Sequence, residues 1–97
     1  MINGDINKFV ECLFLGEELD IVFEGKTYLM EGGYDENKVA EMFVEEYDNN
    51  NHENDHVIFE TTSTKDLREC VEKFLEAPIW NGKKFWEAEK DMEWIDG

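Results

Sequence analysis

The last twenty residues, Pro78–Gly97, carry all three tryptophans of the chain, Trp80, Trp86 and Trp94. An exposed tail would not hold so much aromatic area, because burial of one such ring stabilises a fold by roughly 1.5–3 kcal/mol. We therefore expect this segment to dock on the rest of the chain and complete its core, with Trp86 among the filling side chains. The preceding chain must then supply the apolar faces that receive it.

Apolar side chains recur with helical periodicity in two segments, at about residues 6–15 and 64–76. Asp5 is placed to cap the first helix, and Gly16 stands where a left-handed residue ends one. For the second helix we expect Ser63 as N-cap and Asp66 in place of the usual glutamate of a capping box. Pro78 must end it. The apolar stripes are Ile6, Phe9, Val10, Leu13 and Phe14 in the first segment, and Leu67, Cys70, Val71, Phe74 and Leu75 in the second.

Alternating apolar residues predict strands at 19–24 and 27–31, joined by turn residues at Gly25 into a hairpin. Gly32 and Gly33 follow, and two glycines favour a bulge or bend at that point. A fourth strand is expected at 57–61, where the residues are β-branched or aromatic. Nearer the end, a turn at Asn81–Gly82, a short helix at 84–90 and a closing piece at 92–95 are expected.

Residues 39–47 fit either of two structures. One helix face would present Ala40, Phe43, Val44 and Tyr47, whereas one strand face would present Ala40, Met42 and Val44. The loop at 35–38 is compatible with a hairpin or with a helix cap. We favour a third strand, since the chain has only just turned out of the second.

These elements predict one α+β domain over residues 1–97. Its antiparallel meander has about four strands, with both amphipathic helices on one face because that arrangement buries all the apolar faces. Ninety-seven residues are enough for one modest core. Cys12 and Cys70 fall in the apolar phase of the helices, and we expect them to be buried free thiols.

The charge is strongly one-sided, with 25 acidic residues against 9 lysines and arginines and a net charge of −16. Such a charge opposes binding to nucleic acid or to an anionic membrane and speeds encounter with basic proteins. Solubility alone is an equally good explanation. The start of the chain lacks a basic, then apolar, signal sequence, and no apolar run reaches the ~20 residues that span a bilayer. We expect a cytoplasmic protein that is a monomer or weak dimer.

No catalytic or metal signature is present. Only two histidines exist, His52 and His56, and neither falls beside a serine or cysteine expected on rigid structure. An EF-hand loop counted from Asp48 would place Glu53 and Phe59 where glycine and glutamate are required. We therefore expect no catalytic residues, no metal and no cofactor, and we expect that the protein is not an enzyme.

The acidic surface is the remaining candidate site. Nine acids and a single lysine lie between Asp35 and Glu60. If residues 39–47 form a strand, Glu41 and Glu45 share a face with Phe43 and Tyr47, which combines charge with aromatic anchors for a basic partner. The residues that we expect to bind this partner are Glu41, Phe43, Glu45, Glu46, Tyr47, Asp48, Glu53 and Asp55.

The order of features resembles small bacterial immunity proteins of contact-dependent and other polymorphic toxin systems, together with their uncharacterised relatives. The resemblance covers most of the chain and rests on the hairpin Gly25-Lys26-x-Tyr28 and the ending Gly82-Lys83-Lys84-Phe85-Trp86-Glu87. Both motifs have structural roles, so they support the fold more than the activity. The resemblance implies a non-catalytic inhibitor of one cognate toxin, often a basic nuclease. No interface residue follows from it.

Two alternatives stay open. An acidic nucleic-acid mimic would inhibit several unrelated DNA-binding enzymes, whereas an immunity protein would be selective for one toxin. A small enzyme would need a concave pocket with strongly perturbed titrating groups. If neither applied, the chain would be a small α+β protein of unknown function.

Overall fold

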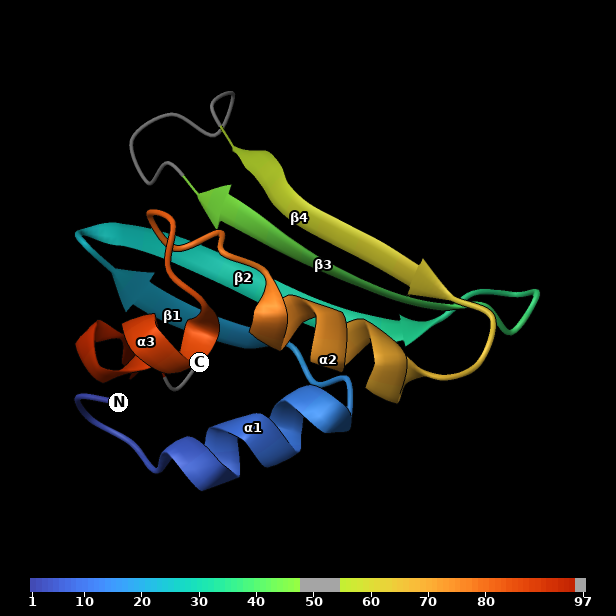
Figure 1. The fold of residues 1–97 in the computed structure, drawn as a ribbon, viewed down its shortest axis with the longest axis horizontal. Coiled ribbons are helices and arrows are strands. Elements are labelled where there is room, and N and C mark those ends of the chain that lie inside the picture. Colours follow the sequence, from blue (N-terminus) through green and yellow to red (C-terminus); the bar gives the residue numbers. More distant parts are fainter. Residues whose placement is uncertain (48–54, 96–97) are drawn as a thin grey trace.

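The computed structural model describes residues 1–47 and 55–95 (Figure 1). A five-stranded antiparallel sheet in the order β4-β3-β2-β1-β5 forms one layer, and its ends do not close on each other. Helices form the second layer on one face of the sheet (Figure 1). The predicted α+β architecture is therefore confirmed, with β5 as a strand beyond the expected four. None of the helices in these ranges is long and apolar enough to cross a membrane.

Helix α1 spans Ile6–Phe14 and begins at Asp5, whose carboxylate accepts hydrogen bonds from the backbone N–H groups of Asn7 and Lys8. It ends where Gly16 adopts a positive φ of 76°. Both expected boundary residues are thus in place.

Strands β1 (Leu19–Phe23) and β2 (Lys26–Tyr34) form the predicted hairpin. Glu24 and Gly25 both have positive φ, as a tight hairpin turn requires. Of the bulge or bend expected at Gly32–Gly33, the bulge is wrong, because the register between β2 and β3 is continuous through both glycines. A Cβ on Gly32 would lie 2.8 Å from Leu67 Cδ1, so close packing of a helix explains this glycine.

Residues 40–47 form strand β3 (Ala40–Tyr47), which confirms the strand over the helix. Strand β4 (His56–Ser63) pairs with β3, and the register shifts by one residue between Val44 and Glu45. The irregularity therefore lies between β3 and β4 rather than at the glycines of β2.

Helix α2 spans Leu67–Glu76, so the expected start near residue 64 is wrong. Ser63 ends β4 instead, and its hydroxyl accepts a hydrogen bond from Lys65 N at 3.0 Å. Asp66 is the N-cap, and its carboxylate accepts from Glu69 N at 3.1 Å. The expected roles are therefore wrong, since Asp66 is the N-cap of α2 and Ser63 precedes the helix as the end of β4.

The C-terminal segment closes the core as expected, through α3 (Phe85–Ala88), the 3-10 turn η2 (Glu89–Asp91) and β5 (Glu93–Ile95). Trp80 is 1% exposed, and its ring lies edge-on to Tyr28 at a centroid distance of 5.0 Å. Trp94 packs edge-on against Phe9. Trp86, however, is 50% exposed, so its expected place in the core is wrong. Residue 86 follows buried Phe85 directly on a short helix and faces outward.

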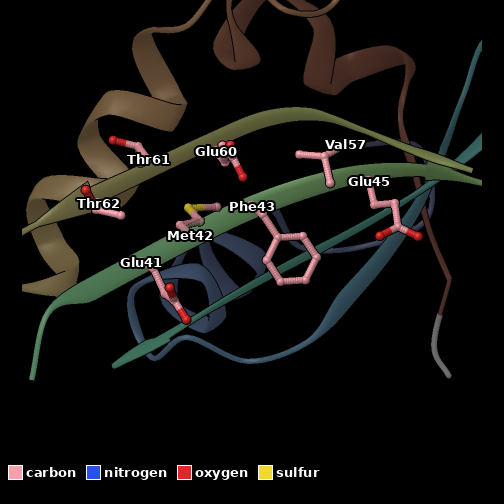
Figure 2. Close-up of a pocket in the computed structure, with 8 residues that line it drawn as sticks. All are labelled: Glu41, Met42, Phe43, Glu45, Val57, Glu60, Thr61 and Thr62. Atoms are coloured by element: carbon pink, nitrogen blue, oxygen red, sulfur yellow. The ribbon is translucent and has the colours of Figure 1, made fainter. Parts of the chain in front are cut away.

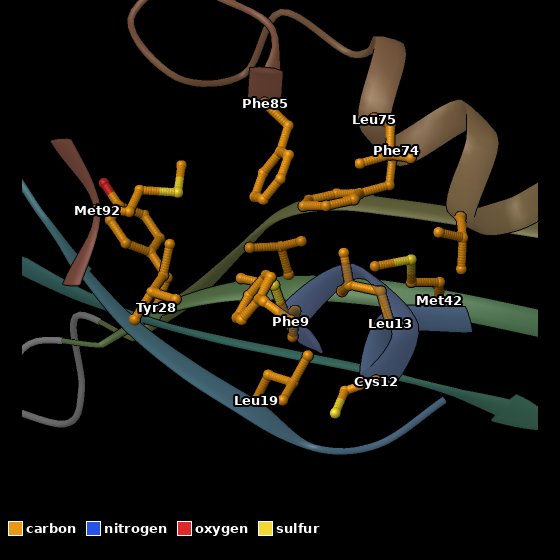
Figure 3. Packing of buried hydrophobic residues seen from close by; sticks show 14 of the residues in the cluster. Phe9, Cys12, Leu13, Leu19, Tyr28, Met42, Phe74, Leu75, Phe85 and Met92 are labelled. Atoms are coloured by element: carbon orange, nitrogen blue, oxygen red, sulfur yellow. The ribbon is translucent and has the colours of Figure 1, made fainter. Parts of the chain in front are cut away.

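Aromatic rings join α1, α2 and α3 to one another within the helical layer (Figure 3). Phe9 of α1 stacks on Phe85 of α3 at 5.8 Å, and Phe85 contacts Phe74 of α2 at 5.6 Å. All three are fully buried. Cys12 and Cys70 are buried free cysteines, as predicted. The core thus lies wholly between the helices and one face of the sheet.

Candidate functional site

In the described strands, every side chain except Leu29 on the face of the sheet that points away from the helices is exposed or half-buried. Residues paired in register share a face, so the outward positions can be read across all five strands. We call this surface the outer face. Its acidic side chains are Asp20, Glu31, Glu41, Glu45, Glu60 and Glu93. No lysine or arginine occupies an outward position in the five described strands.

Phe43 stands at the centre of four of these acids. Glu31 on β2 and Glu60 on β4 are its direct cross-strand partners, and Glu41 and Glu45 lie two residues away along β3. Cross-strand partners have Cβ atoms roughly 4.5–5.5 Å apart, and strand residues two apart are separated by about 7 Å. We call this arrangement the Phe43 cross.

The carboxylates of the Phe43 cross have no ion-pair partner among the described residues. Among the ion pairs between residues 1–47 and 55–95, none includes one of these four glutamates. Most lysines and arginines of these ranges that form ion pairs do so on the helical layer, as Lys84 does with Glu76 at 2.8 Å. Unneutralised carboxylates beside one another favour a cation that arrives from outside.

A hollow of about 640 Å³ lies on the outer face along β3 and β4 (Figure 2). Its lining is Glu41, Met42, Phe43, Glu45, Val57, Glu60, Thr61 and Thr62. A smaller hollow of about 230 Å³ adjoins it over β2 and β3, and the two share Glu41 and Phe43. The lining offers carboxylates, two hydroxyls and apolar surface, which suits a cationic side chain with an apolar stem.

Apolar side chains accompany the acids. Leu29 is only 8% exposed although it lies outside the core cluster, and on the outer face it stands between Asp20 and Glu45 in register. Val57 is 46% exposed and Ile95 is 37% exposed. The outer face therefore combines charge with apolar contact area, the mixture found where proteins bind proteins.

The pKa of Tyr47, near the end of β3, is raised by burial and by carboxylates around it. Burial raises the pKa of its phenol, and the carboxylates of Glu45, Asp20, Glu18 and Asp55 raise that pKa further. The carboxylates of Glu45 and Asp55, two residues of the predicted site, thus both act on Tyr47 electrostatically.

Glu46 is separated from the other predicted residues, because it points to the helix-bearing face of the sheet. Its Oε1 accepts a hydrogen bond from Tyr28 Oη at 3.0 Å and lies 3.5 Å from Lys26 Nζ, while its Oε2 lies 3.6 Å from His56 Nε2. Burial is the largest cause that raises the pKa of Tyr28 to about 12, followed by this hydrogen bond. Glu46 thus has partners within the fold.

Four of the predicted residues, Glu41, Phe43, Glu45 and Tyr47, share the outer face of β3, and the carboxylate of Asp55 acts electrostatically on Tyr47. Asp48 and Glu53 lie outside the described residues. Sequence reasoning missed Glu31 and Glu60. The hairpin turn expected at 35–38 gave only a partial signal for Glu31, because equal counting from it pairs Glu31 with Met42, whereas the register pairs Tyr34 with Ala40 and Glu31 with Phe43. No such signal existed for Glu60, since the long connection before β4 leaves its register open.

A scan against protein-family models found no match, and searches among curated proteins and solved structures found no significant one.

Proposed function

We propose that this chain is a non-catalytic immunity protein of the cytoplasm that binds a basic toxin domain through the outer face of its sheet. The observation that carries the proposal is the Phe43 cross, in which an aromatic ring is surrounded by four carboxylates without an ion-pair partner in the described chain. Its acids are Glu31, Glu41, Glu45 and Glu60.

The mechanism follows from charge and shape. A net charge of −16 accelerates the approach of a basic protein, and the outer face directs that attraction to one side of the sheet. Once docked, lysine or arginine side chains of the partner pair with the glutamates while their stems lie against Phe43 and Val57. A nuclease domain is basic where it binds phosphates, so a protein seated there blocks substrate access.

The test is a pull-down from the native host at low and moderate salt, with bound proteins identified by mass spectrometry. We expect one dominant basic partner that is retained at moderate salt by the natural chain and is lost from Glu60→Lys. The matched control is Glu11→Lys, which makes the same charge change at an exposed position of α1.

The outcomes separate the candidate functions. Equal retention by both variants would contradict the role of the outer face. Capture of several unrelated DNA-binding proteins, each displaced by added DNA, would establish the nucleic-acid mimic instead. Co-expression of the identified partner with the natural chain must also restore growth of cells that the partner alone inhibits.

A further inference from the structure

The two edges of the sheet differ in whether their backbone groups are satisfied. At the β5 edge, the side-chain amide of Asn3 donates to Trp94 O at 2.6 Å and accepts from Trp94 N at 2.6 Å. This pair of bonds reproduces what a neighbouring strand would supply. Ile2 N also donates to Met92 O at 2.9 Å. The first three residues therefore close this edge.

Strand β4 forms the other edge, and no described segment other than β3 pairs with it as a strand. Within the ranges 1–47 and 55–95, residues 57–62 make backbone–backbone hydrogen bonds to β3 alone, and the Thr61 carbonyl also accepts a hydrogen bond from Cys70 Sγ of α2 at 3.9 Å. Figure 1 shows no helix or further strand beyond β4 along its length. Alternate N–H and C=O groups of an edge strand point outward, so this edge is a template for a further strand.

Natural edge strands are blunted by lysine, proline or short length, and β4 has none of these features. It is eight residues long, contains neither residue type, and has its bulge near its start. Its residues 57–62 span about 20 Å, which is enough for a six-residue partner segment.

The side chains along β4 specify the chemistry of that segment. Val57, Glu60 and Thr62 point to the outer face, whereas Phe59 points to the helical side and packs edge-on against Phe74. A basic residue opposite Glu60 would form a cross-strand ion pair. Pairing of two copies of this chain is disfavoured, because each copy carries a net charge of −16.

We propose that the free edge of β4 takes up an extended segment of the basic partner as a sixth strand, with lysine or arginine at alternate positions beside the outer face. This inference rests on the proposed function for the charge of the partner and adds how the partner binds. Main-chain hydrogen bonds to β4 supply affinity, and the alternating basic side chains supply the match to Glu60.

The probe is a cyclic β-hairpin peptide that presents one strand of alternating lysine and threonine. Its control is the same peptide with N-methyl groups on the outward amides of that strand, which keeps the charge but removes the donors. We expect at least tenfold weaker binding of the methylated peptide. Backbone hydrogen exchange should slow at alternate residues within 57–62 on adding the unmodified peptide and stay unchanged in β5.

The outcomes distinguish the edge from the face. Equal binding of both peptides, with no protection in β4, would overturn strand addition, and so would no binding of either. Binding that depends on the free amides but is unchanged in Glu60→Lys, relative to Glu11→Lys, would support strand addition and contradict the acidic face as the interface.

Discussion

Glu45 and Glu46 are adjacent along β3 and meet opposite surroundings, because successive side chains of a strand point to opposite faces. Glu45 lines the hollow of the outer face, while Glu46 accepts the hydrogen bond of Tyr28 and lies beside Lys26. Glu46→Lys should lower the free energy of unfolding by about 1–3 kcal/mol, because it removes that acceptor and places an ammonium near Lys26.

The matched variant Glu45→Lys should change stability by no more than about 0.5 kcal/mol and instead weaken partner binding. Urea unfolding and a binding titration measure the two effects. Equal destabilisation by both substitutions would contradict the separation of these neighbours between two faces.

Tyr28 predicts a loss of stability at high pH. Its pKa is raised to about 12 in the folded chain from an ordinary value of 10. Because the pKa is higher in the folded chain than in the unfolded one, the protonated phenol stabilises the fold. This stabilisation is fully present below pH 10 and is lost as the pH rises from 10 through 12. The loss is on the order of 2 kcal/mol, and Tyr28→Phe should not show it. Urea unfolding at pH 8 and pH 11.5 checks this, and equal losses in both proteins would refute it.

Phe43 predicts a contribution to binding that is larger than its contribution to folding. It is only half-buried on the outer face, so Phe43→Ala should cost partner affinity at least about 2 kcal/mol, or roughly 30-fold. Phe74 is fully buried in the core, and Phe74→Ala should cost about 3–5 kcal/mol of folding free energy. If Phe43→Ala lowered the free energy of unfolding as much as Phe74→Ala does, Phe43 would be a core residue and its assignment to partner binding would be contradicted.

At the scale of elements, the end of α1 meets β2 through a glycine contact. Gly16 has a φ of 76°, and a Cβ there would lie 2.9 Å from the carbonyl oxygen of Gly32. Gly25 has a similar φ of 78° with nothing within 4 Å. Both Gly→Ala substitutions cost about 1–2 kcal/mol for the left-handed backbone. Gly16→Ala should cost at least about 1 kcal/mol more than Gly25→Ala, because its Cβ would also collide with the Gly32 carbonyl oxygen.

Urea unfolding measures the loss of stability in Gly16→Ala and Gly25→Ala. The difference between the two losses is the cost of the contact with Gly32, because both variants share the cost of the left-handed backbone. Equal losses would mean that the helix end can move away from β2 without cost.

Local patterns predicted the elements whose two faces differ clearly. The helical stripes of α1 and α2 and the alternation of β1 follow from one buried side each, and all three were confirmed. Gly32 was misread because its reason, the approach of Leu67, comes from a residue far along the chain. Trp86 was misread because composition alone does not say which ring of an aromatic pair turns inward.

The candidate site was predictable only in part for the same reason. Alternation along β3 is local, so Glu41, Phe43 and Glu45 could be grouped from sequence. Glu60 joins them through the register of β4, and that register depends on a bulge that no local signal announces.

For the whole molecule, the net charge predicts how salt acts on stability. A charge of −16 on 97 residues destabilises the compact state by self-repulsion, and added salt screens that repulsion. The melting temperature should rise by several degrees between about 10 mM and 300 mM sodium chloride, while affinity for a basic partner falls. Thermal unfolding monitored by circular dichroism tests the first effect. A fall in melting temperature would show that ion pairs outweigh the repulsion.

The bonds between Asn3 and Trp94 have a consequence for the order of folding. They join residues 91 apart, and closing so long a loop is entropically costly until the intervening structure has shortened it. The β1–β2 and β2–β3 hairpins pair close neighbours in sequence, so they are the natural early structures. Residues 1–3, which close the β5 edge of the sheet, should therefore pair with it late in folding, after the strands have assembled.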